Sequence, residues 1–373
     1  MNTKQIQQMI PDNVLRSFLK VNQVPEVDKE LVVEALDIGY GFTKYTKGLD
    51  KDGNINCDLF PSVVAVSPNE EMGGDFFTQR DTVTVNVGGI SWEVGPDIND
   101  IRSANDSRAL HENFIRSEQW MVLFLGALAY MEKSSIDFLI LGLPVSNMSQ
   151  AAEVQKLVQK VHKVGDREVE VKNALVIPQP LGALYNYAIN SGQFDRFSQT
   201  NTLVVDPGYL TFDFLVTKGF SVNAHRSGAR PGGMFSILSA ISSSIAQAEG
   251  IEYDDLEQID SSLNIAGYKQ EDGPRRVFVY GKEIQLDPHI KNTMPVIEGS
   301  MNYMLTKINS SKDIAQIVMA GGPNKIFDKA IKKQFPHHQA QALGDGIFSN
   351  VIGFMLWGLM TAYGLAVKEL KTK

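Results

Sequence analysis

Two turns of the chain place a carboxylate two residues before a glycine. Asp37 ends the apolar run LVVEAL and opens the turn DIGYG, and Asp206 ends the run TLVV and opens the turn DPGY. Glycine turns expose backbone N–H groups, and concave clusters of such groups bind phosphate oxygens. A carboxylate at the same tip holds a hydrated Mg²⁺, which keeps most of its waters and bridges to phosphates. One such turn is ordinary turn chemistry, but two predict a polyphosphate site with Mg²⁺ held through water by Asp37 and Asp206.

Two further side chains have the chemistry of phosphoryl transfer. Lys44 lies on the strand that returns from the first turn and supplies a positive charge for the phosphates. Gln179 lies in the corner PQP between an expected strand and an expected helix, where its amide is placed to orient an attacking water. With the turn amides stabilising charge on the phosphates, these residues predict hydrolysis of a nucleoside triphosphate.

Two pairs of adjacent glycines precede expected helices. Gly321 and Gly322 follow the apolar strand IVMA, and their bare backbone allows close approach to a flat group such as adenine or a ribose. Gly232 and Gly233 open a helix near residue 234, where N-terminal amides reach a phosphate. A plain helix entry explains this second pair equally well, and both interpretations stay open.

The elements that position these residues repeat along the chain. Each carboxylate turn joins an apolar strand to a returning strand, FTKYTKG in the first case and TFDFLVTKG in the second. Between the two hairpins, the pattern predicts a helix over 120–131, a buried strand at DFLILGLP and a helix over 151–162. The sequence therefore predicts an α/β fold with an internal duplication.

Composition limits the classes of function. The 373 residues suffice for two cores. The net charge of −8 with dispersed basic residues argues against direct nucleic-acid binding. A single cysteine, Cys57, excludes a disulfide framework and suits a reducing cytosol. The apolar stretch 348–365 is interrupted by glycines, so we expect a buried helix there and no membrane association. We predict a cytoplasmic protein.

In this order, the motifs resemble those of the superfamily of actins, heat-shock chaperones and sugar kinases. The matching segments are 37–44 for the first phosphate motif, 176–184 for the first connecting helix, 206–213 for the second phosphate motif, 320–322 for the adenosine motif and 348–354 for the second connecting helix. The phosphate-motif residues for which the resemblance implies nucleotide binding are Asp37, Gly39, Gly41, Thr43, Lys44, Asp206, Gly208, Thr211 and Asp213.

The resemblance implies an actin-like ATPase fold, with two duplicated ribonuclease-H-like domains around a nucleotide cleft. Domain I is expected over residues 31–195, with 347–373 crossing back to it as a C-terminal helix, and domain II over 196–346. Residues 1–30 form an arm, which is either a short helix packed on the domain surface or a contact for a partner or a neighbouring subunit.

Segments 60–62 (FPS) and 92–95 (WEVG) resemble the plasmid-segregation branch of ParM and StbA, including its PRTRC protein D subgroup. This resemblance implies an ATPase that assembles into filaments and moves plasmid DNA through a separate DNA-binding adaptor. Gln179 replaces the acidic residue usual in ParM-like proteins, and Ile352 replaces an arginine. Two alternatives therefore stay open, a nucleotide-binding scaffold with little hydrolysis and a small-molecule kinase with Asp213 as base. The choice between ATP and GTP is open as well.

Overall fold

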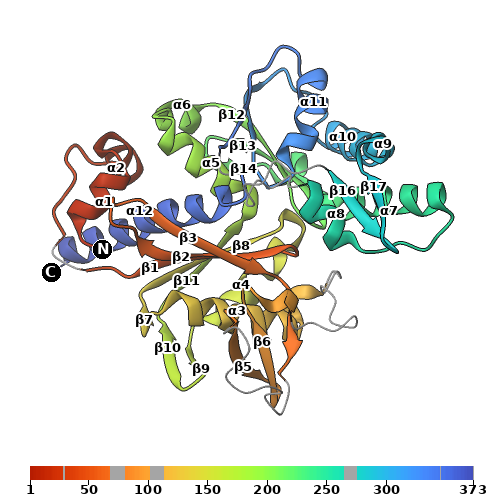
Figure 1. Ribbon diagram of the computed structural model, residues 1–373. Coiled ribbons are helices and arrows are strands. Elements are labelled where there is room, and N and C mark those ends of the chain that lie inside the picture. The colour runs from red at the N-terminus through yellow and green to blue at the C-terminus, as the bar shows by residue number, and fades with distance from the viewer. Residues whose placement is uncertain (28–29, 68–79, 101–112, 264–274, 345, 373) are drawn as a thin grey trace. The chain divides into compact units, whose positions relative to one another are not determined.

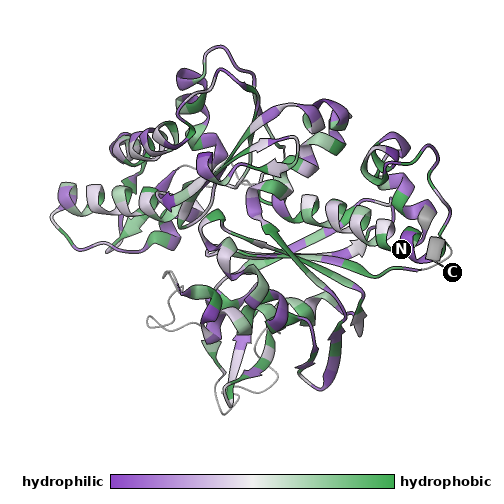
Figure 2. Ribbon diagram, turned by 180° about the vertical axis from the view of Figure 1, so that it is seen from behind, coloured by the Kyte–Doolittle hydropathy of each residue, from purple (hydrophilic) through white to green (hydrophobic). Residues whose placement is uncertain are grey.

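The computed structural model describes all residues except 28–29, 68–79, 101–112, 264–274, 345 and 373 (Figure 1). The chain forms two compact units. The first unit contains residues 1–143, 147–195 and 350–373, and the second contains 144–146 and 196–349. Each has its own central sheet and its own apolar core. In Figure 2, the strands of the first unit's central sheet are coloured mostly as hydrophobic, as expected for a sheet covered on both faces.

The first unit is built on a five-stranded sheet with the order β11-β8-β1-β2-β3. Strands β1, β2 and β3 are antiparallel neighbours, whereas β8 pairs parallel with β1 and β11 pairs parallel with β8. The strands are β1 (Val33–Ile38), β2 (Phe42–Leu49), β3 (Ile55–Pro61), β8 (Phe138–Leu143) and β11 (Ala174–Pro178).

Helices α3 (Glu118–Met131) and α12 (Ser349–Thr372) cover opposite faces of this sheet (Figure 1). Leu36 of β1 packs in the cluster that contains α3. On the other face, a Cβ added to Gly358 of α12 would meet the Ile140 and Val33 side chains. Helix α12 is long and apolar enough to cross a membrane, but 78% of its apolar window is buried within the protein. It is a core helix.

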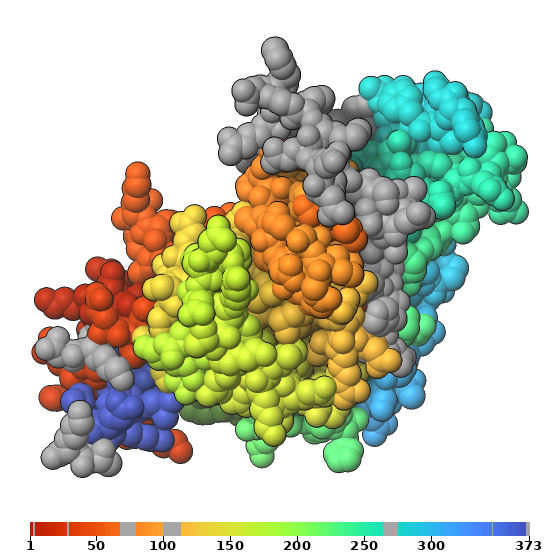
Figure 3. Space-filling model, turned by 90° about the horizontal axis from the view of Figure 1, so that it is seen from below, coloured from red at the N-terminus to blue at the C-terminus, as the bar shows by residue number. Residues whose placement is uncertain are grey.

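An arm, two small sheets and two further α-helices complete the first unit. An arm of helices α1 (Thr3–Met9) and α2 (Asp12–Leu19) packs on α12, because Leu19 reaches Gly364 and the Tyr363 hydroxyl donates to the Pro25 carbonyl. Figure 3 shows the two small sheets side by side on one face of this unit, β5–β6 in orange and β9–β10 in yellow-green. The remaining elements are α4 (Ala151–Val158), α5 (Gln179–Asn190), β4 (Ala65–Val66), β5 (Val83–Val87), β6 (Ile90–Val94), β7 (Ser135–Ile136), β9 (Val161–Val164) and β10 (Arg167–Val171).

The helix predicted over 151–162 is wrong in its last turn. Helix α4 ends at Val158, and the chain enters the hairpin of β9 and β10 at Val161. The hairpin turns at Gly165, which has φ +59°. His162 lies inside β9, where alternation of buried and exposed side chains replaces the helical period.

The second unit repeats this arrangement with the sheet order β14-β13-β12-β18-β19, and β15 also pairs with β13. Strands β12 and β13 are antiparallel, whereas β18 pairs parallel with β12 and β19 pairs parallel with β18. The strands are β12 (Asn201–Pro207), β13 (Thr211–Lys218), β14 (Ser221–Val222), β15 (Gly228–Pro231), β18 (Ile314–Met319) and β19 (Ala340–Ala342).

The core of the second unit lies between this sheet and several helices. On β13, Phe212 packs on Phe327 of α11, with ring centroids 5.0 Å apart, and Phe214 packs on Tyr303 of α10. The elements around this core are α7 (Met234–Glu249), α8 (Leu256–Leu263), α9 (Asp287–Ile290), α10 (Met294–Ile308), α11 (Asn324–Gln334), β16 (Arg276–Val279) and β17 (Lys282–Gln285). Helix α6 (Phe194–Gln199) contains the boundary between the two units.

The two sheets confirm the predicted duplication. Strands β1, β2, β8 and β11 correspond to β12, β13, β18 and β19 in order and in direction. The register agrees as well. Asp37 lies opposite Lys44 and Asp206 lies opposite Asp213, and both pairs are seven residues apart (44 − 37 and 213 − 206).

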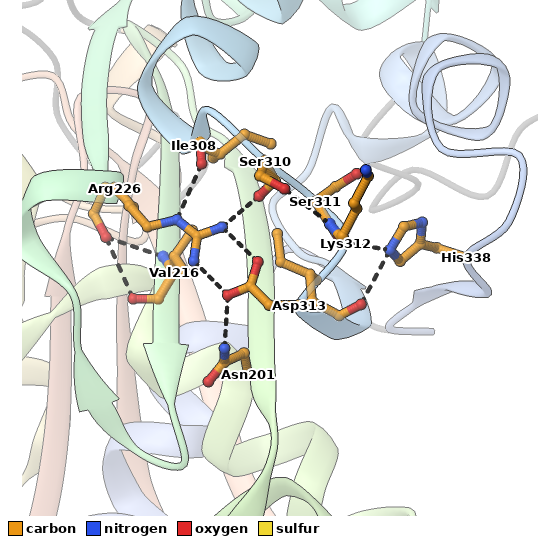
Figure 4. A network of polar contacts seen from close by, with 11 residues as sticks. Asn201, Val216, Arg226, Ile308, Ser310, Ser311, Lys312, Asp313 and His338 are labelled. Atoms are coloured by element: carbon orange, nitrogen blue, oxygen red, sulfur yellow. Dashed lines mark hydrogen bonds and ion pairs between the residues drawn. The ribbon is translucent and has the colours of Figure 1, made fainter.

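A polar network closes the second sheet at the end remote from the Asp206 turn (Figure 4). Asp313, just before β18, binds the Arg226 guanidinium through both carboxylate oxygens at 2.6 and 3.0 Å. It also accepts a hydrogen bond from Asn201, the first residue of β12, at 2.8 Å. The Arg226 hydrogen bond lowers the pKa of Asp313. The network joins the starts of two parallel strands to the end of α10, where Arg226 donates to the Ile308 carbonyl.

Candidate functional site

The first half-site lies at the tip of β1 and β2. Asp37 is 1% exposed, and both of its carboxylate oxygens are bound. Lys44 Nζ lies 2.7 Å from Oδ2, and Gln179 Nε2 donates to Oδ1 at 2.6 Å. Lys44 reaches Asp37 because the two residues face each other across the β1–β2 ladder. Gln179 arrives because β11 ends at Pro178 and α5 starts there, at the carboxyl edge of the parallel strands.

These contacts give Gln179 a defined orientation. A buried carboxylate needs a cation and hydrogen-bond donors around it, and Asp37 obtains both. Because the Gln179 amide nitrogen is bound to Asp37, its carbonyl oxygen is the group that can accept a hydrogen bond from a water. The structure thus brings together three of the predicted site residues, Asp37, Lys44 and Gln179.

The glycines of the first turn leave room for this cluster. Gly39 N donates to the Phe42 carbonyl at 3.1 Å, and a Cβ at Gly39 would lie 3.2 Å from that oxygen and 3.6 Å from Lys44 Nζ. The Gly41 carbonyl accepts from the Ser62 amide at 3.0 Å. Thr43 is fully buried, and its hydroxyl pairs with that of Ser62. Its side chain therefore supports the turn from within the core.

The second half-site lies at the tip of β12 and β13. Asp206 is 6% exposed and faces Asp213, which is 3% exposed, across the ladder. The Asp213 carboxylate accepts from the Thr211 hydroxyl at 2.5 Å and from the Val145 amide at 3.1 Å. Among the residues that the structure describes, no three His, Cys, Asp or Glu side chains gather as a metal-binding group. Two adjacent carboxylates suit an ion such as Mg²⁺, which is bound by few protein ligands and keeps several waters.

Gly321 brings the predicted adenosine segment to the second turn. Its φ is +75°, and a Cβ there would lie 2.3 Å from the Pro207 carbonyl oxygen and 2.7 Å from Asp206 Oδ1. Only glycine combines this backbone conformation with such a close approach. Gly322 follows it, half-buried, directly before α11. Because β18 runs parallel to β12, both strands deliver their carboxyl ends to the same edge.

The glycines before α7 hold the second turn. Gly232 N and Gly233 N both donate to the Leu210 carbonyl at 3.2 Å, and Met234 N donates to the Gly208 carbonyl at 3.0 Å. A Cβ at Gly233 would lie within 2.8 Å of three carbonyl oxygens of the turn. These amides therefore bind the turn, which favours the helix-entry interpretation of Gly232 and Gly233 over a direct phosphate contact.

Comparison with known proteins agrees with this architecture. Residues 35–182 match the family model described as the N-terminal domain of actin-like proteins. The fold is similar to that of the archaeal actin homologue Ta0583, at 19% identity and a TM-score of 0.69, covering 89% of this chain and all of that one. This chain has the actin-like fold.

Two more actin-like structures are similar over nearly their whole length. A ParM from a 15-stranded filament of Clostridium botulinum is 18% identical with a TM-score of 0.67, covering 88% of this chain and 99% of that one. Alp7A is 14% identical with a TM-score of 0.67, covering 91% and 99%. Ta0583 has also been solved in complex with ADP. No curated protein sequence matches this chain.

Within the actin-like fold, the two segments likened to connecting helices meet in the first unit. A Cβ at Gly353 of α12 would lie 1.7 Å from the Gly182 carbonyl of α5, and a Cβ at Gly182 would lie 2.5 Å from the Asn350 carbonyl. Phe354 fills the space beside Gly142 and Gly182. The two helices thus cross in backbone contact, and this crossing fixes the start of α5, where Gln179 lies.

Ser62 and Val145 belong to the site environment, but the sequence assigned neither a role. Ser62 lies in the FPS segment, which was a signal only of resemblance, and its hydroxyl donates to the Gly39 carbonyl at 2.6 Å. The backbone amide of Val145 donates to Asp213, and a backbone contact of this kind cannot be predicted from the residue type. Tyr40 and Tyr209, the tyrosines of the two turns, pack on Phe114 and Phe235.

Proposed function

We propose that this actin-like protein binds and hydrolyses a nucleoside triphosphate with Mg²⁺, and that this cycle controls its assembly into filaments that move plasmid DNA. The observation that carries the proposal is the pair of half-sites at equivalent positions of a duplicated fold. One contains Asp37 with Lys44 and Gln179, and the other contains Asp206 with Asp213. A triphosphate needs cationic and metal-holding groups, and the side chains of these two turns include both kinds.

Each side chain has a role in this proposal. Asp37 and Asp206 hold the water shell of Mg²⁺, which supplies charge neutralisation on the phosphates when bound. Lys44 contributes a second positive charge beside Asp37. Gln179 accepts a hydrogen bond from the attacking water through its carbonyl oxygen, because Asp37 holds its amide nitrogen.

The remaining residues shape the nucleotide site. Thr211 and Asp213 form the edge of the second turn, joined by their own hydrogen bond. The backbone around Gly39, Gly41 and Gly208 binds the phosphates. Gly321 and Gly322 admit the adenosine close to the second turn. The purine itself, adenine or guanine, is decided by the assay below.

The filament and its cargo are proposed from similarity of fold. Proteins with this fold include a ParM that forms a filament, so the first partner proposed is a further copy of this chain. The net charge of −8 argues against direct DNA binding, so a DNA-binding adaptor protein links filament and plasmid. We propose that the protein works in the cytoplasm without a membrane partner. Burial of 78% of the apolar window of α12 within the protein supports this proposal.

One alternative is favoured by a specific observation. Gln179 is an amide, so it orients water but does not take its proton. A scaffold that binds nucleotide and hydrolyses it slowly fits this chemistry. A small-molecule kinase fits less well, because Asp213, its candidate base, already accepts hydrogen bonds from Thr211 and Val145.

The test is light scattering of the purified protein at micromolar concentration with Mg²⁺ and ATP, GTP or ADP, with phosphate release followed in parallel. If a nucleoside triphosphate makes the scattering rise, and the scattering then decays as phosphate is released, the result supports a dynamic filament. Scattering without phosphate release supports the scaffold, and absence of nucleotide binding refutes the proposal.

The matched variants are Asp206→Asn and Asp254→Asn. Asp254 is an exposed aspartate of the same unit, remote in sequence from the turn. We expect Asp206→Asn to slow phosphate release about 10- to 100-fold, as for loss of an outer-shell metal contact, and Asp254→Asn to leave it unchanged. Equal activity of both variants would show that the half-site is assigned wrongly.

A further inference from the structure

The two phosphate turns expose equivalent backbone carbonyls that need partners. The repeat offset is 169 residues (206 − 37), so Gly39 corresponds to Gly208 and Gly41 to Leu210. In a turn whose outer side is left for a ligand, these carbonyls must be bound from the inner side, because an unpaired buried carbonyl is costly.

In the second unit, backbone amides bind both carbonyls. Met234 N donates to Gly208 O at 3.0 Å, and Gly232 N and Gly233 N donate to Leu210 O at 3.2 Å. All three donors lie at the entry of α7. Because every group involved is main chain, truncation of a side chain to alanine removes none of these hydrogen bonds.

In the first unit, one residue binds the corresponding pair. The Ser62 hydroxyl donates to Gly39 O at 2.6 Å, and the Ser62 amide donates to Gly41 O at 3.0 Å. Ser62 lies one residue after the end of β3 and is 4% exposed. Its hydroxyl has a single hydrogen, which is given to Gly39, so Thr43 is the donor in the 3.0 Å contact between the Thr43 and Ser62 hydroxyls. The result is a chain of hydrogen bonds from Thr43 through Ser62 to the turn.

We propose that Ser62 is a positioning residue for the first phosphate turn. With its hydroxyl and its amide, this one residue binds the carbonyls that the entry of α7 binds in the second unit. The turn it holds lies beside the Lys44–Asp37 pair, because a Cβ at Gly39 would be in ordinary contact with Lys44 Nζ, at 3.6 Å. Asp37 and Lys44 flank this turn, so a change in the turn backbone is expected to change their relative position. We call the two hydrogen bonds from Ser62 to Gly39 O and Gly41 O the clamp. The effect of the clamp on nucleotide affinity rests on the proposed nucleotide binding, whereas the clamp itself does not.

The test compares Ser62→Ala with Ser227→Ala. Ser227 is a matched control in the second unit, because it is also 4% exposed and its hydroxyl also bridges backbone, donating to Asn223 O at 2.7 Å and accepting from Val216 N at 2.9 Å. Two readouts are taken: hydrogen exchange of the free protein in peptides covering 37–44 and 206–213, and the Kd of a fluorescent ATP analogue with Mg²⁺.

We expect Ser62→Ala to speed hydrogen exchange in peptide 37–44 and not in 206–213. The Kd should rise about tenfold, because binding must then order a turn that has lost one buried hydrogen bond. Ser62→Thr, which keeps the hydroxyl, should restore both. Ser227→Ala should change neither, at a comparable loss of thermal stability. Unchanged exchange in 37–44 overturns the clamp, and an equal rise in Kd for both alanine variants overturns the positioning role. If the wild-type protein binds no nucleotide, the proposed function fails, but the exchange result still decides the clamp.

Discussion

Glu34 makes the first unit less stable as the pH rises toward neutrality. It lies on β1, three residues before Asp37, and is 1% exposed. Its carboxylate accepts from the Thr46 hydroxyl at 2.5 Å and from Gly48 N at 3.1 Å, and Lys133 Nζ lies 3.8 Å away. Burial raises the pKa of Glu34 from 4.5 to about 7, although these donors, Lys133 and the chain's terminal amine all favour the charged form.

The size and the sign follow from proton linkage. Between pH 4.5 and 7 the unfolded chain has lost a proton that the folded protein retains, so the free energy of unfolding falls as the pH rises. At about 1.4 kcal/mol per pH unit, the interval of about 2.5 units gives a loss of about 3.5 kcal/mol. Stability from this group is highest below pH 4.5 and lowest above pH 7.

Glu34→Gln should remove this dependence. The amide has the same shape, carries no charge at any pH and still offers an oxygen to Gly48 N. We expect the free energy of unfolding of the variant to match that of the wild type near pH 5 and to exceed it at pH 8, by at most about 3.5 kcal/mol. Denaturant unfolding followed by tryptophan fluorescence measures this unit selectively, because all three tryptophans, Trp92, Trp120 and Trp357, belong to it.

Glu168→Gln is the control, since Glu168 is an exposed residue of β10 in the same unit. It should leave the wild-type pH profile unchanged. Parallel pH profiles for the wild type and Glu34→Gln would refute the reasoning, because they would mean that Glu34 is charged in both the folded and the unfolded protein across this range.

The second unit yields two further predictions. Gly321→Ala should destabilise the protein and abolish nucleotide binding, because its Cβ would lie 2.3 Å from the Pro207 carbonyl oxygen. Gly250→Ala, also at positive φ but with open space around it, should cost about 1–2 kcal/mol and leave the Kd unchanged. In the wild type, the hydrogen bond from Arg226 to Asp313 stabilises the protein fully above pH 3.8, and this stability is lost as the pH falls through the lowered pKa of Asp313. Asp313→Asn should remove this contribution. Calorimetry from about pH 2 to 5 should therefore show a flatter acid limb for this variant, and an unchanged limb would contradict the assignment.

The sequence is sufficient to predict those elements whose signals lie within a few neighbouring residues. Each strand-turn-strand unit could be predicted because an apolar run ends in Asp and glycine within a few residues, and the structure confirms both hairpins and their repetition. The helix over 151–162 was predicted too long because apolar residues at helical spacing continue into β9. There, Gly165 and the alternation of buried residues in the hairpin give the competing signal.

The contacts that complete each half-site could not be predicted, because they join residues far apart in the sequence. Ser62 reaches Gly39 over 23 residues, and Val145 reaches Asp213 over 68. Nothing in the types of these residues indicates the distance in space. Gln179 was proposed from its chemistry alone. That its amide binds Asp37, 142 residues earlier, depends on the crossing of α5 and α12.

The duplication preserves the backbone but changes the charge. At equivalent ladder positions, the partner of Asp37 is Lys44, whereas the partner of Asp206 is Asp213. The first turn therefore pairs its carboxylate with an ammonium group, whereas the second has an aspartate at both ladder positions. Magnesium prefers oxygen ligands, so two acidic positions are compatible with the proposed role of Asp206 in holding the water shell of Mg²⁺. Asp37 keeps the same proposed role and in addition binds Lys44 and Gln179, which fixes the position of both side chains.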